Sequence, residues 1–436
     1  MTLTSGKVVL SNPLTCTNTA KGENKLYSDA KGVVPSLDLR FAEGKNLNDY
    51  MTGQNLITFS RSSIGTYVDE NGIIQTATAD TPRFDHDPTT GESLGLLIEE
   101  SRTNLFPISE NYTSWNVYNI ATKTTDGTTI AGLTAVKLTS SVDTNALFLE
   151  GNNATFTANT TYTTSVYHKP GNLDGFWFEI RFYAGGGTPR VFFDSTTETW
   201  SADSGTFNGQ PWSVKSQKVE SNAWRHSITF YIATDTAGTA RIGALGPVNS
   251  TNVSTGDYGY IAAPQIEAGS FPTSYIPTTG TALTRSADVA SITGTNFSSW
   301  YNQSEGSFYY EGAAHNNSLN GVRFVSGTHP RSFLNSGSAG NNNVGSYDGT
   351  NSVGLNGGIN WQDGTKAAVS WSSATRTITK DGQVPYTAVS NQHNIAETQV
   401  YLNRSSNGTS ILSGTISRLT YFPERLPDSS LQTMTQ

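Results

Sequence analysis

The chain has 436 residues, of which only 14% are charged, and it carries a net charge of −8 at pH 7. Binding to phosphate groups requires clustered Lys and Arg, so this acidic balance argues against nucleic acid as a partner. No run of apolar residues is long enough to cross a bilayer, which argues against membrane insertion. The length suggests two to four domains.

The composition favours an all-β protein. Ser, Thr and Asn crowd nearly every segment, and there are 42 glycines. These residues disfavour long helices, because their side chains compete for backbone hydrogen bonds or, for Gly, because ordering costs the most entropy. Aromatic residues make up 11% of the chain, enough to build sizeable cores. We therefore predict short strands joined by many turns.

Residues 1–36 are predicted to form an extended N-terminal arm. They are polar, with turn formers at Ser11-Asn12-Pro13, and show no sustained periodicity. The arm could be a flexible terminus, or an anchor that orders only against a partner or a neighbouring subunit. It holds the only cysteine, Cys16, so no disulfide can form within the chain, and we expect an inert thiol. The first residues lack the pattern of a secretory signal peptide.

Residues 37–106 are predicted to form a small β module that serves for attachment. Apolar and polar residues alternate over 37–41, which indicates a strand. Residues 64–68 and 73–77 flank Asn71-Gly72, the turn sequence of a β-hairpin. Residues 95–99 form a further apolar run that is too short for a helix.

Two β-sandwiches are predicted to follow, over 107–283 and 284–428, with a short tail at 429–436. In the first, apolar runs separated by Gly, Asn, Asp and Ser suit a sandwich or jelly roll. The strongest predicted strands there are 162–168, 176–182, 190–193, 224–230 and 260–267. In the second they are 306–312, 367–371, 376–380 and 414–422. A Pro-punctuated stretch at 271–280 joins the two, and no fixed-period repeat is present.

Motifs that carry catalysis or bind metals and cofactors are not found in the sequence. None of the six histidines lies in a zinc-protease motif, and a single Cys excludes a Cys-rich zinc site. There is no phosphate-binding loop after a strand. We therefore expect no cofactor and assign no metal ligand, although a structural calcium held by loop oxygens is compatible with a jelly roll.

Two groups of neighbouring titratable residues are candidates for catalysis. Asp85-His86-Asp87 could act in general acid–base chemistry, but its position before a Pro-Thr-Thr-Gly turn favours turn and capping hydrogen bonds. Glu99 and Glu100 are adjacent on a predicted strand and point to opposite faces, so they cannot form a glycosidase pair. We expect one of them to pair with Arg83 or Arg102, and we predict no catalytic residue.

Four aromatic residues are candidates for stacking against sugar rings. Trp200, Trp212, Tyr347 and Trp361 lie in or beside polar loops, where an exposed ring could serve as a platform for a glycan. The alternative is that they pack in the core or at its edge, since Trp is usually well buried.

The segment from Ile57 to Leu105 resembles a module found in many phage structural proteins. The resemblance is carried by Ile-Thr-Phe-Ser-Arg-Ser-Ser-Ile-Gly-Thr-Tyr-Val-Asp-Glu-Asn-Gly from residue 57, by Pro-Arg-Phe-Asp-His-Asp-Pro from residue 82, and by Gly-Leu-Leu-Ile-Glu-Glu-Ser-Arg-Thr-Asn-Leu from residue 95. Similar proteins follow this module with a jelly roll like a carbohydrate-binding module, and residues 265–278 look like its ending. The closing strand 414–422 is similar to the end of a concanavalin A-like (laminin G-like) domain.

These resemblances imply a non-enzymatic structural protein of the virion, of the tail-fibre type. They imply a homo-oligomer, with a trimer expected, that is joined to other virion proteins through the N-terminal arm and contacts a host-surface glycan. The implied location is the virion, after assembly in the host cytoplasm and release by lysis. Two alternatives remain: a head-decorating or collar fibre with no receptor role, and a depolymerase that cuts glycans.

Overall fold

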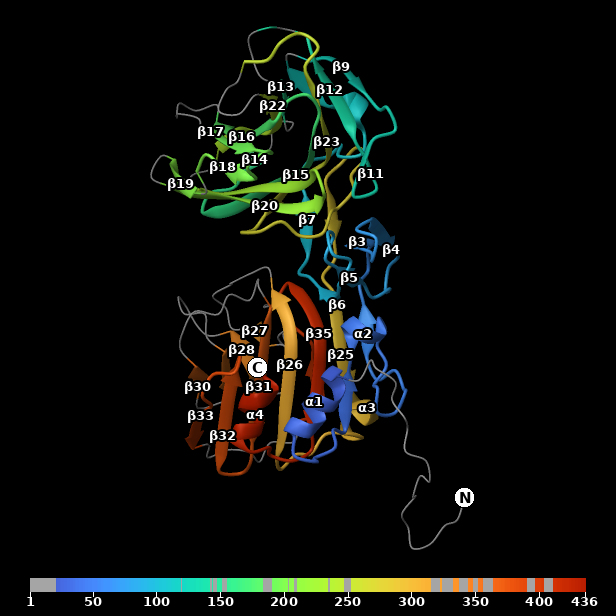
Figure 1. Ribbon diagram of the computed structural model, residues 1–436, viewed down its shortest axis with the longest axis vertical. Helices are drawn as coiled ribbons and strands as arrows, with labels where there is room; N and C mark the ends of the chain where they lie inside the picture. The colour runs from blue at the N-terminus through green and yellow to red at the C-terminus, as the bar shows by residue number, and fades with distance from the viewer. Residues whose placement is uncertain are drawn as a thin grey trace, which may run out of the picture.

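The computed structural model consists of two β lobes stacked along the long axis and joined by a narrow waist (Figure 1). It describes residues 21–118, 120–141, 143, 147–150, 155–182, 190–202, 204–207, 210–233, 236–246, 252–314, 322–323, 332–336, 344–347, 352–355, 364–389, 397–403 and 411–436. The upper lobe is built from the middle of the chain, and the lower lobe from its two ends. The predicted all-β fold class is confirmed.

The lower lobe is organised around a large antiparallel sheet in the order β33-β32-β31-β26-β35-β6-β5, with β1 also paired to β35. Its strands are β1 Leu37–Leu39, β5 Phe84–His86, β6 Ser93–Ile98, β26 Gly306–Ala314, β31 Thr365–Trp371, β32 Thr375–Lys380, β33 Tyr386–Val389 and β35 Gly414–Phe422. Strands from near residue 40 and from near residue 420 thus lie side by side.

Smaller sheets complete the lower lobe. One has the order β2-β25-β34, and the other β27-β28-β29-β30. Their strands are β2 Thr58–Ser60, β25 Val289–Thr293, β34 Gln399–Tyr401, β27 Val322–Arg323, β28 Ser332–Ser336, β29 Val344–Tyr347 and β30 Ser352–Leu355. The short helix α3 Gly294–Ser298 lies beside the first of them, while α2 Phe41–Gly44 contacts β6 and β35 of the large sheet.

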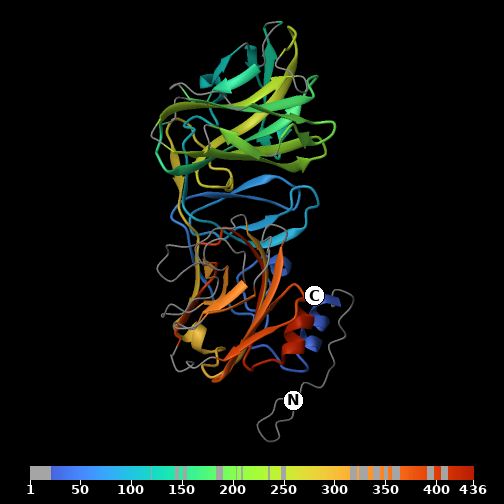
Figure 2. The ribbon, with the colours of Figure 1, turned by 90° about the vertical axis from the view of Figure 1, so that its left-hand side faces the viewer.

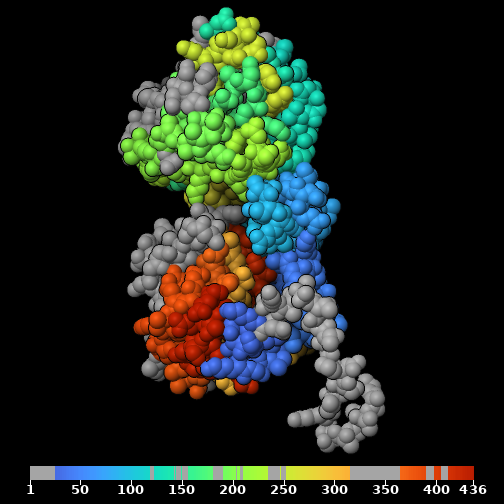
Figure 3. Space-filling model, viewed as in Figure 1, coloured from blue at the N-terminus to red at the C-terminus, as the bar shows by residue number. Residues whose placement is uncertain are grey.

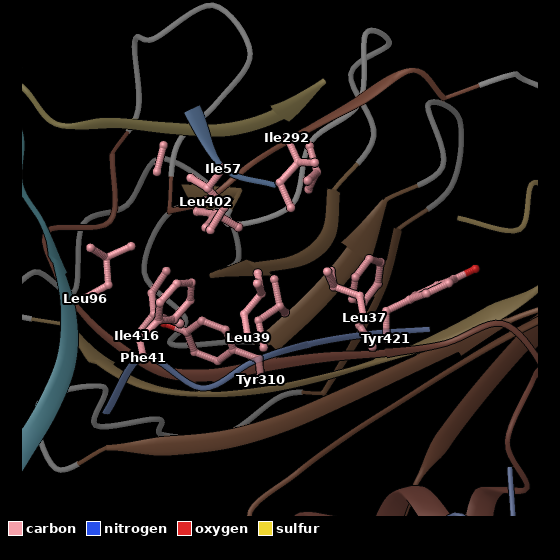
Figure 4. Packing of buried hydrophobic residues seen from close by; sticks show 14 of the residues in the cluster. Leu37, Leu39, Phe41, Ile57, Leu96, Ile292, Tyr310, Leu402, Ile416 and Tyr421 are labelled. Carbon is pink, nitrogen blue, oxygen red and sulfur yellow. The ribbon is translucent and has the colours of Figure 1, made fainter. Parts of the chain in front are cut away.

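The core of the lower lobe joins residues that are far apart in the sequence (Figure 4). Leu37 and Leu39 of β1 lie in one cluster with Ile416 of β35, Tyr310 of β26 and Ile292 of β25, all fully buried. The predicted alternation is confirmed here, because the intervening residue of β1 points away from this cluster. Burial of apolar surface from both ends of the chain therefore holds the two ends together.

Two helices cover the opposite face of the large sheet, where they lie side by side (Figure 2). They are α1 Lys21–Asp29 and α4 Asp428–Met434. Leu26 of α1 and Leu431 of α4 pack with Tyr309 and Phe422 of the sheet. Residues 21–29 therefore form a packed helix where an extended arm was predicted, and 428–434 form a helix where a tail was predicted. Apolar residues on one side of each short segment give it a face to bury. Cys16 and the rest of 1–20 lie outside the described residues.

The only sheet that the segment 37–106 forms by itself, among the described residues, is the two-stranded hairpin of 65–68 and 74–77. The segment also supplies β1, β5 and β6 to the large lower sheet and β2 to a smaller one. Strands of three to six residues bury too little surface alone, and their apolar faces complete the core of the 284–428 sandwich instead. The arrangement thus differs from the predicted small module.

The waist contains the predicted hairpin, with β3 Gly65–Val68 paired to β4 Ile74–Ala77. Gly72 in its turn has φ +76°, the left-handed conformation that the Asn-Gly sequence predicts. A second connection is made where β7 Arg102–Asn104 pairs with β24 Leu283–Arg285. The chain enters the upper lobe after β7 and returns before β24, so the upper lobe is an insertion in the lower one.

The upper lobe contains two antiparallel sheets that lie face to face, as the side view shows (Figure 2). The sheet nearer the waist comprises, in order, β19 Ser204–Phe207, β20 Gln210–Glu220, β21 Ala223–Ile232, β15 Thr160–Pro170, β23 Tyr258–Ala268, β12 Val136–Ser140 and β9 Ile120–Thr124. The other comprises β18 Thr199–Trp200, β17 Arg190–Asp194, β16 Gly175–Phe182, β22 Thr236–Gly246, β13 Leu147–Glu150 and β8 Asn116–Tyr118, with β14 Thr155–Phe156 beside β22. A turn at η1 Tyr112–Ser114 and the pair β10 Thr129–Ile130 and β11 Leu133–Thr134 complete it. The predicted strands of 107–283 all lie in these sheets.

A pair of histidines is buried between the two upper sheets. Nδ1 of His168 lies 3.2 Å from Nε2 of His226, whose Nδ1 is 2.7 Å from Oγ of Ser216. Phe176 and Phe193 surround the pair. Burial lowers the pKa of His168 to about 3 and that of His226 well below its ordinary value. Both imidazoles are therefore neutral in the folded protein.

We expect acid to destabilise the upper lobe through this pair. A histidine in the unfolded chain binds a proton below about pH 6.5, but the buried pair does not. The contribution of the neutral pair to the free energy of unfolding is therefore fully present above that pH and is lost as the pH falls. As the pH falls from about 6.5 to 5, each histidine should lower the free energy of unfolding by about 2 kcal/mol. His226→Gln should remove the pH-dependent loss of stability that one histidine causes. Urea unfolding at several pH values measures this difference. An unchanged pH dependence in this variant would contradict the assignment.

Candidate functional site

A pocket of about 570 Å³ lies between the upper lobe and the waist. This volume is within the range of about 300–1,000 Å³ that small-molecule sites occupy. The space-filling view shows the two lobes joined by the narrow waist, which borders the pocket (Figure 3). Two further pockets, of about 470 and 270 Å³, are smaller.

Three parts of the chain form the walls of this pocket, which we call the inter-lobe pocket. The outer face of the upper sheet contributes β15, β20 and β21. The second side is formed by the waist hairpin β3–β4 together with β5 and β6 of the lower lobe, and residues 271–275 run along a third side. Residues of β21 alternate between the two faces, so Trp224 and Ile228 enter the core of the upper lobe. Arg225 and Ser227 face the pocket instead.

Asp85 and Tyr167 both line the inter-lobe pocket. Desolvation by burial raises the pKa of Asp85 to about 6, and the negative charge of Glu99 acts in the same direction. Oδ1 of Asp85 accepts a hydrogen bond from the Val68 amide at 2.7 Å. Burial also raises the pKa of Tyr167, and the charge of Asp85 adds to this effect. The Tyr167 hydroxyl makes no hydrogen bond to the described residues.

The next two residues of the Asp85-His86-Asp87 group have different roles. Nδ1 of His86 lies 3.0 Å from the Val68 carbonyl, so it carries the proton, and the buried Nε2 has no hydrogen-bond partner among the described residues. Asp87 accepts hydrogen bonds from the amides of Thr89 and Thr90 and from the Thr89 hydroxyl. The predicted turn hydrogen bonds are confirmed for Asp87.

Arg225 lines the inter-lobe pocket without a carboxylate partner. Its Nη2 donates to Oγ of Ser165 at 3.0 Å and to the Thr273 carbonyl at 2.8 Å, and its guanidinium lies 5.4 Å from the centre of the Tyr167 ring. Nε is buried without a hydrogen-bond partner. Within the described part of the chain, this cation is therefore held by neutral groups only.

A buried network of charges fixes the waist wall beside the pocket. Asp288 binds Arg61 through Oδ1 at 3.0 Å and Arg83 through Oδ2, while Arg83 also binds Glu99 at 2.8 Å. Arg285 lies 3.5 Å from the same Glu99 oxygen. All five side chains are at most 1% exposed.

The network also reaches the third side of the inter-lobe pocket. Both Glu99 oxygens accept hydrogen bonds from Ser274, through its amide at 2.8 Å and its hydroxyl at 2.7 Å. Burial opposes the charge of Glu99, but Arg285 and Arg83 outweigh it and hold the pKa well below its usual range. Glu99 is thus an ionised structural group whose oxygens are occupied, and it is not free to act as an acid or base.

The expected ion pairs are present. Glu99 pairs with Arg83, and Glu100 pairs with Arg102. The prediction that the two glutamates face opposite ways is consistent with these separate partners.

The structure places Trp200 and Trp212 against the core of the upper lobe, where both are half-buried. Nε1 of Trp200 donates to Oγ of Ser216, and its ring stacks on Phe178 at 5.9 Å with an interplanar angle of 13°. The ring of Trp212 covers Gly205, where a Cβ would come within 2.7 Å of it. These contacts favour the packing alternative, and neither residue lines the inter-lobe pocket.

The other two aromatic candidates are not brought to the pocket. Tyr347 ends β29, but its side chain lies outside the described residues, as does all of Trp361. Their role as glycan platforms stays a prediction. Sequence reasoning missed Tyr167 and Arg225, which the alternation of β15 and β21 places on the outer face of their sheet. The alternation shows that these two side chains point out of the upper lobe, but it does not show which residues lie opposite them.

Two functional features are absent from the described residues. No group of three or more His, Cys, Asp or Glu is arranged to hold a metal ion. No helix there is long and apolar enough to span a membrane.

Three solved structures are similar to parts of this chain. The Ruminococcus gnavus IT-sialidase CBM40, bound to alpha2,3 sialyllactose, is 18% identical with a TM-score of 0.25, over 31% of this chain and 84% of its own. Domains LG4-5 of the mouse laminin alpha1 chain are 12% identical with a TM-score of 0.21, over 66% and 92%. The Trypanosoma rangeli sialidase is 8% identical with a TM-score of 0.24, over 70% and 60%.

These likenesses are too weak to say what the chain does. No protein-family model matches the sequence. No curated protein matches it either.

Proposed function

We propose that this chain is a non-enzymatic structural protein of a bacteriophage particle, an appendage of the tail-fibre type whose upper lobe contacts glycans of the host surface. The observation that carries the proposal is that the middle of the chain forms a lobe inserted into a second lobe, and we assign presentation to the former and attachment to the latter. Helices α1 and α4, near the two chain ends, lie on the lower lobe, and the upper lobe is an insertion held beyond the waist (Figure 1).

A buried network of charges in the waist supports a presenting role. The buried charges of Arg61, Arg83, Arg285, Glu99 and Asp288 join segments on either side of the inserted lobe. Such a network fixes the orientation of the groups that it joins, which an appendage needs in order to hold a binding lobe away from its base. The likeness of residues 57–105 to phage structural modules supports placement on the virion.

Two rivals remain open to test. A head-decorating or collar fibre would use the same architecture without contacting a receptor. A depolymerase would need two carboxyl groups facing each other across a cleft. In the inter-lobe pocket the oxygens of Glu99 are occupied by Ser274 and Arg83, which leaves Asp85 without a carboxylate free to act beside it. This arrangement favours binding over hydrolysis.

Truncation tests the attachment role. Removing residues 1–36 would delete Tyr27, whose hydroxyl donates to the buried Asp38 at 2.7 Å, and would disturb the lower lobe. A variant that lacks only residues 1–20 keeps every described element. We expect it to fold with an unchanged melting temperature but to be lost from purified particles, as measured by immunoblotting.

Electron microscopy of wild-type particles labelled with an antibody to the upper lobe shows where on the particle the protein lies. Labelling of tail appendages is expected, together with trimers of the protein. Label at the head or collar would favour the first rival, and absence from particles would overturn the proposal. If the truncated chain is incorporated into particles normally, residues 1–20 are not the anchor.

A further inference from the structure

We infer that the inter-lobe pocket binds a carboxylated sugar, with the ligand's carboxylate on Arg225 and its hydroxyl groups on Asp85 and Tyr167. The inference deepens the proposed function, on which it rests, because it assigns both the place of glycan contact and the chemical class of the glycan.

The first argument is the state of Arg225. Its only hydrogen bonds within the described residues go to neutral oxygens of Ser165 and Thr273, which together occupy one of its three nitrogens. A guanidinium presents a rigid fork that matches a carboxylate through two parallel hydrogen bonds. In the buried network beside the pocket, Arg83 is neutralised by Glu99 and Asp288. Arg225 has no such partner, so an anionic group of a ligand would complete it.

The second argument is the set of hydrogen-bonding groups that line the pocket with Arg225. The Tyr167 hydroxyl has no partner among the described residues, and the buried Nε2 of His86 accepts no hydrogen bond. Asp85 accepts a hydrogen bond from the Val68 amide at Oδ1 and interacts with the His86 amide, and its carboxylate can accept further hydrogen bonds. Unmet donors and acceptors of this kind cost free energy unless a ligand or water satisfies them. Hydroxyl groups, which both donate and accept, suit them all.

The third argument is shape. Tyr167, Phe271 and Tyr275 give the pocket aromatic surface beside its polar groups. Sugar rings combine apolar C–H faces with hydroxyl edges, so a wall that combines rings with polar atoms suits them. Asp85 and Arg225 approach Tyr167 as a carboxylate and a cation. A ligand with a carboxylate at one end and hydroxyls at the other would match this polarity.

Titration calorimetry on the full-length protein tests the inference with glucuronate and glucose, which differ only by a carboxylate in place of a hydroxymethyl group, and with their short oligomers. Wild type should bind the glucuronate compounds at least about tenfold more tightly, as a charge-assisted hydrogen bond predicts. Arg225→Gln should lower glucuronate affinity by at least about tenfold while changing glucose affinity little. Arg225→Lys, which keeps the charge but loses the fork, should lie between.

A second variant and a matched control keep the test independent of folding. Tyr167→Phe keeps the ring and should weaken both sugars about fivefold. Lys218→Gln removes a cation from the same lobe whose partner, Glu198, lies outside the pocket, and should change neither affinity. The comparison of the two sugars on wild type needs no variant. Circular dichroism checks that each variant folds.

The outcomes separate the inference from the proposed function. Equal affinity for both sugars, no binding to either at millimolar concentration, or an unchanged glucuronate affinity in Arg225→Gln would each overturn the inference. If an antibody to the upper lobe still labels tail appendages and blocks adsorption of particles to cells, the proposed function stands despite that failure. Absence of the protein from particles would remove the proposed function whatever the sugar affinities are.

Discussion

Replacing Asp288 by alanine should lower the free energy of unfolding by about 3–5 kcal/mol. Asp288 is fully buried and joins Arg61 and Arg83, and its Oδ2 also accepts a hydrogen bond from the Glu99 amide at 2.8 Å. Without it, three buried arginines would share the single negative charge of Glu99 in the network. An uncompensated buried charge is costly because the protein interior solvates it poorly.

Urea unfolding measures this loss, and hydrogen exchange in β5, β6 and β25 shows where it acts. Lys45→Gln is the control, because Lys45 and its partner Glu70 form a surface pair, 40% and 64% exposed. Such pairs contribute about 0–1 kcal/mol. An Asp288→Ala variant as stable as this control would show that the network does not hold the waist.

Replacing Phe41 by alanine should also cost about 3–5 kcal/mol of unfolding free energy. Phe41 begins α2, is fully buried, and lies in one core cluster with Tyr310 of β26 and Ile416 of β35 (Figure 4). Removal of the ring leaves a cavity and loses its transfer free energy. Because the core is shared, the loss should appear as faster hydrogen exchange in β26 and β35, more than 250 residues away in the sequence.

The control for this variant is Val34→Ala, since Val34 is 66% exposed and should change stability by less than about 0.5 kcal/mol. If residues 37–106 folded as an independent module, Phe41→Ala would speed exchange only within that segment. Protection of β26 and β35 at the wild-type level would therefore contradict the shared core.

The sequence predicted the strands and turns well because these follow from local chemistry. Alternation of apolar and polar residues placed Leu37 and Leu39 on one face, and Asn71-Gly72 set a turn that needs positive φ. It was less informative about α1, which is short and polar and becomes a helix only beside α4 and the sheet. Short helices gain most of their stability from such packing.

The candidate site could be predicted only in fragments. Residue type and spacing predicted turn hydrogen bonds for Asp85-His86-Asp87 and an ion pair of Glu99 or Glu100 with Arg83 or Arg102. Arg225 was not predicted, because nothing local marks a strand arginine as lacking a counter-charge. That property depends on which carboxylates the fold brings near it.

By itself, then, the sequence determined that this protein is all-β, where most of its strands run, and which face of each strand is apolar. Only the tertiary structure decided which strands pair, that β1 and β6 complete a sheet with β35, and that Asp85, Tyr167 and Arg225 meet at one pocket. The reason is physical: side-chain alternation and turn conformation are set by neighbours in the chain. Strand pairing and the balance of buried charge depend on contacts between distant residues, and these form only when the whole core is buried.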